Sequence, residues 1–305
     1  MKRTPGILTR WLAVLALAFA AVPAAHAETT ACTVIVSLPA VLDTPGHYCL
    51  ESDFTQSLAT TAIQVNADGI VLDCNGHRIR NTNSTSGATG IGGYDRKDTI
   101  IRNCVVDGFF NDISMLSSAD TAGTGNLIEG NTALNARSTA IYVIGSYNRV
   151  VRNRVTSVTG NYNGVAYGIF LYSAQSTGVG NAIVDNIISN FRPSPPPGTP
   201  CAPSPITFAN VRNTEVTGNT VSGIYATTGQ YVYAIQSSGA TQSVVSGNTV
   251  LSAPPLPAPL DGSQSAGIIL FGTLEEHAGT ACTDNIVGHF NNNLSGCVKN
   301  ANTEF

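Results

Sequence analysis

The sequence is short of charge. Its 305 residues include 15 Lys and Arg and 19 Asp and Glu, which is 11 % of the chain, where an ordinary soluble domain carries about 25 %. Coiled coils and helical bundles are rich in Glu, Lys and Arg, so this scarcity argues against both. A formal net charge of −4 also argues against nucleic acid as a partner, because phosphates are bound mainly by Lys and Arg. The 43 % of apolar residues argue against disorder.

The first 27 residues differ from the rest. They begin with basic residues, continue with an apolar run at 11–22 and end in Ala25-His26-Ala27, the order of regions in a secretory signal peptide. The apolar run is shorter than the roughly 20 residues that span a bilayer, so we expect no membrane span in the mature protein. We predict cleavage after Ala27 and a secreted or periplasmic protein.

None of the seven cysteines has the Cys-x-x-Cys spacing of a zinc site. An exported chain can oxidise its cysteines, so we expect structural disulfides rather than a metal site. Two pairs lie near the two ends of the mature chain, Cys32 with Cys49 and Cys282 with Cys297. Cys74 and Cys104 could pair across adjacent layers, and Cys201 would then have no partner for a disulfide.

An internal repeat predicts the fold. An Asn followed two residues later by a small or branched apolar residue recurs at intervals of 22 to 37 residues, at Asn103, Asn131, Asn153, Asn186, Asn219, Asn248 and Asn285. Short alternating runs surround each Asn, and such alternation is typical of strands with one buried face. Three strands fit each repeat, as around Ile141, Val150 and Val155. A repeat of this length indicates a solenoid, which explains the recurring Asn better than a β-sandwich does.

In such a solenoid each coil climbs about 4.8 Å and its strands stack in parallel on those below. Inward side chains then form columns. The first-strand column is predicted to contain Ile91, Ile113, Ile141, Ile169, Ile235 and Ile268. The third-strand column is predicted to contain Val105, Ala133, Val155, Ile188, Val221, Val250 and Val287. The recurring Asn is expected at a corner, where it tolerates a left-handed backbone and where stacked amides could bond along the axis.

The segments GIVLDCNGHRI (69–79) and DTIIRNCVVDGF (98–109) resemble the opening coils of right-handed parallel β-helix repeat proteins, the superfamily that includes pectate lyases. The resemblance covers roughly residues 62–297. It implies an all-β, single-stranded right-handed parallel β-helix of about eight coils with disulfide-closed caps. The same coil also serves binding and maturation proteins, so the resemblance is specific for fold rather than for activity.

This resemblance implies a domain organisation. The signal peptide, residues 1–27, is followed by an N-terminal cap at 28–61, the β-helix at 62–287 and a C-terminal cap or tail at 288–305, because the ends of a solenoid must be covered. The large insertions, several of them rich in Pro, fall between the third strand of one coil and the first strand of the next. They are expected to flank one edge of the first-strand face.

That face is predicted to be uncharged and aromatic. Its outward columns contain Tyr94, Tyr142, Phe170, Tyr172 and Phe271. Aromatic rings can stack on sugar rings, and contiguous apolar patches are often binding surfaces, although these rings could instead pack under the Pro-rich loops. We take these five residues and Arg96 as candidate contacts to a polysaccharide or cell-envelope glycan, bound by a monomer.

Catalysis has less support. Glycoside hydrolysis needs two carboxyl groups beside the bond, and the outward first-strand columns contain no charged residue. Tyr94, Asp95 and Lys97, at one turn, are the candidate catalytic groups, and any enzyme would be a lyase or epimerase rather than a hydrolase. Glu275-Glu276-His277 could hold a cation at another turn, yet no motif supports Ca²⁺. We expect no cofactor.

The sequence therefore predicts an exported β-helix protein that binds, and could also modify, an acidic polysaccharide. The alternative is a non-catalytic periplasmic or surface protein, adhesin-like or similar to the β-helix proteins that assist maturation of copper enzymes. Copper sites favour clusters of Met, His or Cys, and the mature chain has one Met and four scattered His.

Overall fold

A computed structural model describes residues 31–160, 165–176, 178–191, 202–225, 232–252, 265–272, 277–290, 292–296, 298–300 and 302–304. Apart from Ala31 these residues belong to one unit, Cys32–Phe305. The predicted signal peptide, most of the Pro-rich insertions, Glu275, Glu276, Cys201 and Cys297 lie outside the described residues.

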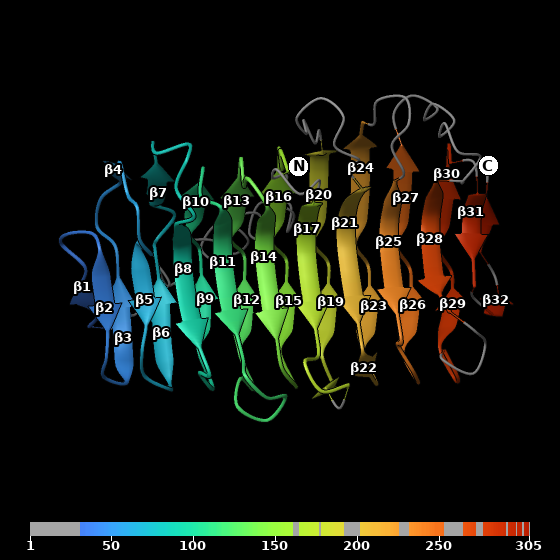
Figure 1. Cartoon of the computed structure of the whole chain (residues 1–305), viewed down its shortest axis with the longest axis horizontal. Coiled ribbons are helices and arrows are strands. Elements are labelled where there is room, and N and C mark those ends of the chain that lie inside the picture. The colour runs from blue at the N-terminus through green and yellow to red at the C-terminus, as the bar shows by residue number, and fades with distance from the viewer. Residues whose placement is uncertain are drawn as a thin grey trace, which may run out of the picture. The chain divides into compact units, whose positions relative to one another are not determined.

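The described chain is built from short parallel strands in three long sheets (Figure 1). We name the sheets by the order in which each coil visits them. The first-strand sheet contains β2 (Ala40–Leu42), β5 (Ile63–Val65), β8 (Thr89–Tyr94), β11 (Asn111–Leu116), β14 (Thr139–Ile144), β17 (Val165–Tyr172), β21 (Ala202–Ala209), β25 (Tyr233–Ser238), β28 (Ala266–Phe271) and β31 (Asn292–Ser295).

The second-strand sheet contains β1 (Thr33–Val34), β3 (Gly46–Cys49), β6 (Ile70–Asp73), β9 (Ile100–Arg102), β12 (Leu127–Glu129), β15 (Arg149–Val151), β19 (Ala182–Val184), β23 (Glu215–Thr217), β26 (Val244–Ser246), β29 (Ala281–Thr283) and β32 (Val298–Asn300). The third-strand sheet contains β4 (Phe54–Gln56), β7 (Arg78–Asn81), β10 (Val105–Asp107), β13 (Thr132–Leu134), β16 (Arg154–Thr156), β20 (Ile187–Phe191), β24 (Thr220–Ile224), β27 (Thr249–Ser252), β30 (Ile286–Gly288) and β33 (Thr303–Glu304). A small sheet pairs β18 (Gly178–Val179) with β22 (Val211–Arg212).

This order of parallel strands is the predicted right-handed parallel β-helix. Eight strands of the first-strand sheet, β5 to β28, lie within residues 62–287, so the eight predicted coils are present. The terminal segments add β2 and β31 to the same sheet, which brings it to ten strands. Among the described residues, no helix is long and apolar enough to cross a membrane.

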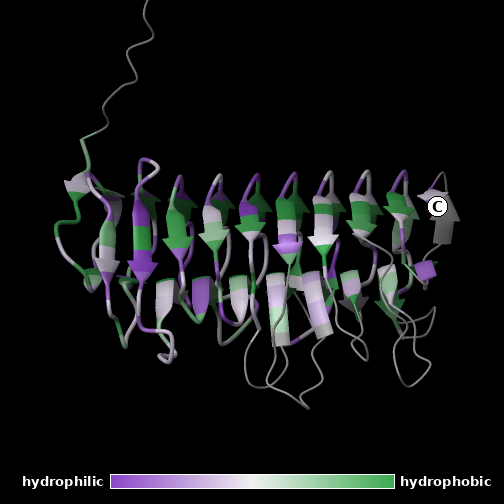
Figure 2. Cartoon of the chain, turned by 90° about the horizontal axis from the view of Figure 1, so that it is seen from above, coloured by the Kyte–Doolittle hydropathy of each residue, from purple (hydrophilic) through white to green (hydrophobic). Residues whose placement is uncertain are grey.

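The core consists of columns of apolar side chains between the sheets, and Figure 2 shows hydrophobic and hydrophilic residues alternating along the strands. The predicted isoleucine column is confirmed: Ile91, Ile113, Ile141 and Ile169 pair in register and are fully buried. The column continues through Ile206 into Ile235 and Ile268. Each coil therefore buries one branched side chain against the equivalent side chain of the preceding coil.

The third-strand column is confirmed except at its beginning. Ala133 pairs with Val106, which is fully buried, and Val105 lies on the outer side of the strand. The prediction of Val105 was wrong by one residue. Aligning Asn103 with the other recurring Asn residues caused the shift, because the equivalent position is Cys104.

Six of the recurring asparagines and Asn302 form a ladder along the corner between the second-strand and third-strand sheets, and all of them except the half-buried Asn302 are buried. Its members are Asn131, Asn153, Asn186, Asn219, Asn248, Asn285 and Asn302. The Oδ1 of each accepts the backbone N–H of the preceding member, as from Asn131 to Asn153 at 2.9 Å, and its Nδ2 donates to a backbone carbonyl, as from Asn153 to Ile128 at 2.8 Å. The predicted bonding of stacked amides along the axis is therefore confirmed.

From Asn131 to Asn285, the left-handed backbone at this corner belongs to the residue before each ladder Asn. Arg152 and Asp185 have a φ of 55°, and Gly218 has a φ of 66°. The expectation that the recurring Asn itself takes this conformation was wrong, apart from Asn103 at 54°. The ladder Asn is retained for its amide, which satisfies buried backbone groups that water cannot reach.

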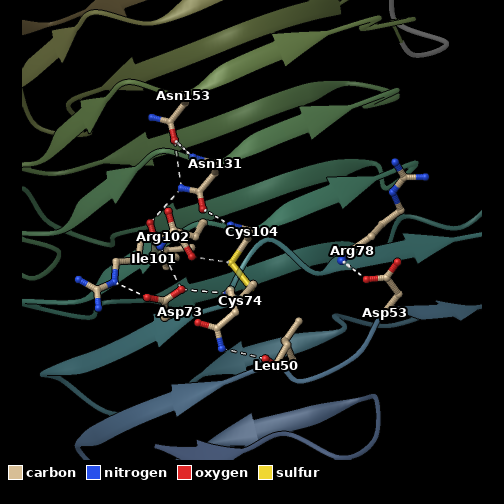
Figure 3. The surroundings of a disulfide bond; sticks show 12 residues. Leu50, Asp53, Asp73, Cys74, Arg78, Ile101, Arg102, Cys104, Asn131 and Asn153 are labelled. Atoms are coloured by element: carbon tan, nitrogen blue, oxygen red, sulfur yellow. Dashed lines mark hydrogen bonds and ion pairs between the residues drawn. A yellow bond between two sulfur atoms is a disulfide. The ribbon is translucent and has the colours of Figure 1, made fainter. Parts of the chain in front are cut away.

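Two disulfides strengthen the N-terminal coils. Cys32 bonds to Cys49, as predicted, with their Cα atoms 5.8 Å apart. Cys74 bonds to Cys104, with their Cα atoms 4.7 Å apart. The N–H of Cys104 donates to Asn131 Oδ1 at 3.0 Å, so this disulfide continues the Asn ladder toward the N-terminus (Figure 3). Cys282 is also disulfide-bonded, but its predicted partner Cys297 is outside the described residues.

Candidate binding surface on the first-strand sheet

The predicted aromatic residues lie on the outer face of the first-strand sheet. Tyr142 of β14 pairs with Phe170 of β17, and Ile144 pairs with Tyr172. The inward residues Ile141 and Ile169 alternate with them and fix their outward direction. The predicted register of this face is thus present, and it places three rings on two neighbouring strands.

These rings form a stack with a fourth that the sequence did not reveal. The ring of Phe170 lies 5.0 Å from that of Tyr142, with 12° between the planes, and 4.6 Å from that of Tyr167, with 27° between the planes. Tyr172 is tilted against Phe170 at 6.0 Å. Phe170 is therefore the central ring of the group, which we call the ring cluster: Tyr142, Tyr167, Phe170 and Tyr172.

Strict alternation along β17 would point Tyr167 inward, because Ile169 points inward. The alternation breaks in this column, where consecutive residues are buried on both strands: Thr139, Ala140 and Ile141 on β14, and Gly168 and Ile169 on β17. Gly168 permits the backbones of β17 and β21 to approach closely at this point, since a Cβ on residue 168 would lie 2.4 Å from the carbonyl oxygen of Pro205. Small residues at 140 and 168, each two positions before the outward aromatic, were the only sequence signal for this break.

The hydroxyls of Tyr142 and Tyr167 stay protonated over the physiological range. Burial raises the pKa of Tyr167, and burial together with the neighbouring hydroxyls of Tyr172 and Tyr167 raises the pKa of Tyr142. A protonated hydroxyl can both donate and accept a hydrogen bond, so the cluster combines apolar rings with neutral polar edges.

Phe271 belongs to a second, smaller group. Its ring meets that of Tyr233 edge-on at 4.9 Å, with 85° between the planes, and 36 % of Phe271 is exposed. Tyr94 lies at the other end of the face on β8 and is 54 % exposed. The five predicted aromatic contacts therefore lie on one face but do not form one continuous cluster.

The turn after Tyr94 does not arrange its charged groups around a common point. Asp95 accepts hydrogen bonds from the N–H of Ser118 at 2.7 Å and from its hydroxyl at 2.8 Å, and these bonds lower the pKa of Asp95. Arg96 donates to the carbonyl oxygens of Tyr94 and Asn66 at 2.7 and 2.8 Å. Lys97 is exposed. Asp95 thus holds the turn that follows β11.

One carboxyl group of the first-strand sheet faces inward. Asp112 of β11 is fully buried, its Oδ1 accepts the N–H of Phe109 at 3.3 Å, and its Oδ2 has no hydrogen-bond partner in the described part of the chain. Burial raises the pKa of Asp112 well above its ordinary range, and the charge of nearby Asp107 adds to the shift. This acid is inaccessible to a ligand on the outer face.

The fold and this face define a class: parallel β-helix proteins with an uncharged aromatic strand face. The sequence profile of the family described as "Periplasmic copper-binding protein (NosD)" matches residues 26–192, more than half of the chain. The chain therefore belongs to this family.

A solved structure, that of the Dettilon tailspike protein (gp208), is similar to the chain at 14 % identity with a TM-score of 0.40. The similarity covers 90 % of this chain, which spans 60 % of the tailspike chain. No curated protein matches the sequence.

The described residues do not fit the copper of the family description. Among them no group of three or more His, Cys, Asp or Glu is placed to hold a metal ion. Met115 is 2 % exposed, and the Nδ1 of His277 lies 3.2 Å from the carbonyl oxygen of Ala240. The Nδ1 of His77 lies 3.1 Å from Asp53. Soft donors of the kind that copper prefers are thus scattered or engaged in the described chain.

Proposed function

We propose that the protein is exported and binds a linear acidic polysaccharide along the outer face of its first-strand sheet. The ring cluster is the observation that carries this proposal. Its rings lie on two adjacent parallel strands, and the outward columns around them contain no charged side chain in the described residues. Aromatic faces can stack on the apolar faces of sugar rings, and a row of strands offers them along a line.

Binding is better supported than cleavage. Hydrolysis would need two carboxyl groups flanking the bond, one of them protonated. Asp95 is held by Ser118 and Asp112 is buried behind the sheet. If the protein does modify its ligand, it acts as a lyase or epimerase, with Tyr94 or Lys97 as the catalytic group.

The first experiment measures binding of the mature protein to immobilised polygalacturonate, alginate, hyaluronate and, as neutral polymers, cellulose and chitin. We expect retention on at least one of the three acidic polymers. Tyr142→Ala and Tyr172→Ala should each weaken that binding at least five-fold, whereas the control Tyr147→Asn should not. Tyr147 is 60 % exposed at the turn between β14 and β15, and its φ of 54° suits Asn. Equal affinities of all variants would reject the proposal.

The same incubations test for modification. Release of unsaturated sugars would identify a lyase, and its loss in Tyr94→Phe or Lys97→Ala would assign the group. Mass spectrometry of the secreted protein tests cleavage after Ala27, and light scattering tests whether the protein is a monomer in solution.

A non-catalytic periplasmic maturation protein is the second candidate, and the family match favours it. Equilibrium dialysis against Cu⁺ and Cu²⁺ separates the two. Stoichiometric binding of copper without binding of any polymer would favour this second function.

A further inference from the structure

A short polar segment, Ser117–Asp120, crosses several coils beside the aromatic face. At one end Ser118 donates two hydrogen bonds to Asp95. At the other end Asp120 accepts hydrogen bonds from the hydroxyl of Ser173 at 2.6 Å and from the N–H of Ala174 at 3.0 Å. Asp120 is 1 % exposed, and Asp120 and Ser173 are 53 residues apart in sequence. We call this segment the strap.

The strap ends beside two of the aromatic residues. Asp95 directly follows Tyr94, and Ser173 directly follows Tyr172. Both tyrosines lie in one outward column, because Tyr94 pairs with Leu116 and Tyr172 pairs with Ile144 on the intervening strands. They are three strand steps apart, about 14 Å at the usual spacing of parallel strands. The strap therefore connects the turns that carry the two rings.

The surface between the two rings is uncharged. Leu116 and Ile144 occupy the column there and are both half-buried, so they form an apolar floor. The tilted ring of Phe170 supports Tyr172 from the side at 6.0 Å. A flat ligand can lie across this floor with a ring at each end.

Two cations lie at the Tyr94 end of this surface. Arg96 donates to two neutral carbonyl oxygens, and among the described residues it makes no ion pair. Lys97 beside it is exposed. The carboxylate of Asp95 is engaged by Ser118. Arg96 and Lys97 are the cations that can meet a uronate carboxylate at this end, and the exposed carboxylates of Asp68 and Asp98 lie at the same turn.

We infer that Tyr94, Tyr172 and the floor between them form one subsite of set length, which takes about four consecutive residues of an extended uronate chain. A sugar unit in such a chain advances by roughly one strand spacing. When the first sugar lies at one tyrosine ring, the fourth sugar therefore lies at the other, three spacings away. Asp95 and Asp120 are positioning residues that hold the two rings at this separation. This inference rests on the proposed function.

The test is calorimetric titration of the mature protein with oligogalacturonides and oligoalginates of two to eight residues. For the wild type we expect affinity to rise at least ten-fold between three and four residues and by less than three-fold with each further residue. Tyr94→Ala and Tyr172→Ala should each abolish this step, since the fourth sugar then contributes no second ring contact.

The strap is tested with Asp120→Ala and, as a milder change, Ser173→Ala. Both keep the two rings, and both should reduce the step at least three-fold while binding of the long polymer persists. Asp284→Asn is the control, because Asp284 is an exposed carboxylate at the opposite corner, between β29 and β30. Circular dichroism confirms that each variant is folded, and Ser173→Ala still tests the strap if Asp120→Ala does not fold.

The outcomes separate this inference from the proposed function. Affinity that rises smoothly with length, or a step that survives in both tyrosine variants, overturns the subsite, while a loss on Tyr142→Ala would still support binding on the face. A step that survives in both strap variants overturns the positioning role. No binding of any oligomer or polymer rejects the proposed function and this inference together.

Discussion

The Asn ladder makes a quantitative prediction at Asn219, a fully buried rung in the middle of the row. Its Oδ1 accepts the backbone N–H and the side-chain amide of Asn186, each at 3.0 Å. Its Nδ2 donates to the carbonyl oxygen of Ile183 at 2.9 Å and to Asn248 at 3.0 Å. Asn219→Ala removes all of these bonds without adding a group that could replace them.

The expected loss of stability follows from the groups that remain. Two buried N–H donors of Asn186 lose their acceptor, and an unpaired buried polar group costs about 1–3 kcal/mol. Asn219→Ala should therefore lower the free energy of unfolding by about 2–6 kcal/mol. The carbonyl of Ile183 also loses its donor, so the upper half of this range is expected.

Urea unfolding followed by far-UV circular dichroism measures this loss as a lower midpoint. Asn111→Ala is the control, because Asn111 lies half-buried at the start of β11 outside the ladder, and it should change stability by less than about 0.5 kcal/mol. Asn302→Ala, at the C-terminal and only half-buried end of the ladder, should cost less than Asn219→Ala. Equal losses for Asn219→Ala and Asn111→Ala would refute the assignment of stability to the ladder.

Three further predictions concern buried groups. Asp112 has a raised pKa in the folded state, so its unfavourable contribution should grow as pH rises above about 4, the ordinary value of an unfolded Asp. The urea midpoint of Asp112→Asn should therefore exceed that of the wild type by an amount that grows as pH rises. A difference that stays constant with pH would count against this. Replacing Cys74 and Cys104 by Ala opens a 30-residue loop and should cost about 3–4 kcal/mol in oxidising buffer, with no difference from the wild type in reductant. The hydroxyl of Ser237 is buried without a partner in the described chain, so Ser237→Ala should raise the thermal midpoint, and a lower midpoint would show an unseen partner.

Much of the fold could be predicted because each coil repeats the same local pattern. Inward residues such as Ile141 and Val155 recur at one position per coil, and parallel stacking then determines their neighbours. The errors arose where one coil departs from the pattern. At Cys104 a disulfide replaces the Asn rung, so aligning on Asn103 moved the column to Val105.

The candidate site was predictable only in part. The outward register of Tyr142, Phe170 and Tyr172 follows from alternation and is present in the structure. Tyr167 could not be found in this way, because two consecutive residues of β17 are buried. Asp95 was expected to face a ligand, and its bonds to Ser118 in the next coil give it a different environment.

The sequence by itself determined the coil, because the spacing of apolar residues and asparagines is a local property that every turn of a solenoid must satisfy. Only the tertiary structure decided which outward groups are engaged. The strap, through its bonds to Asp95 and Ser173, joins irregular turns of different coils, and no period in the sequence encodes such contacts. Whether a polar side chain on this face is available to a ligand depends on those contacts, since a carboxylate already bound by neighbouring donors has little left to offer.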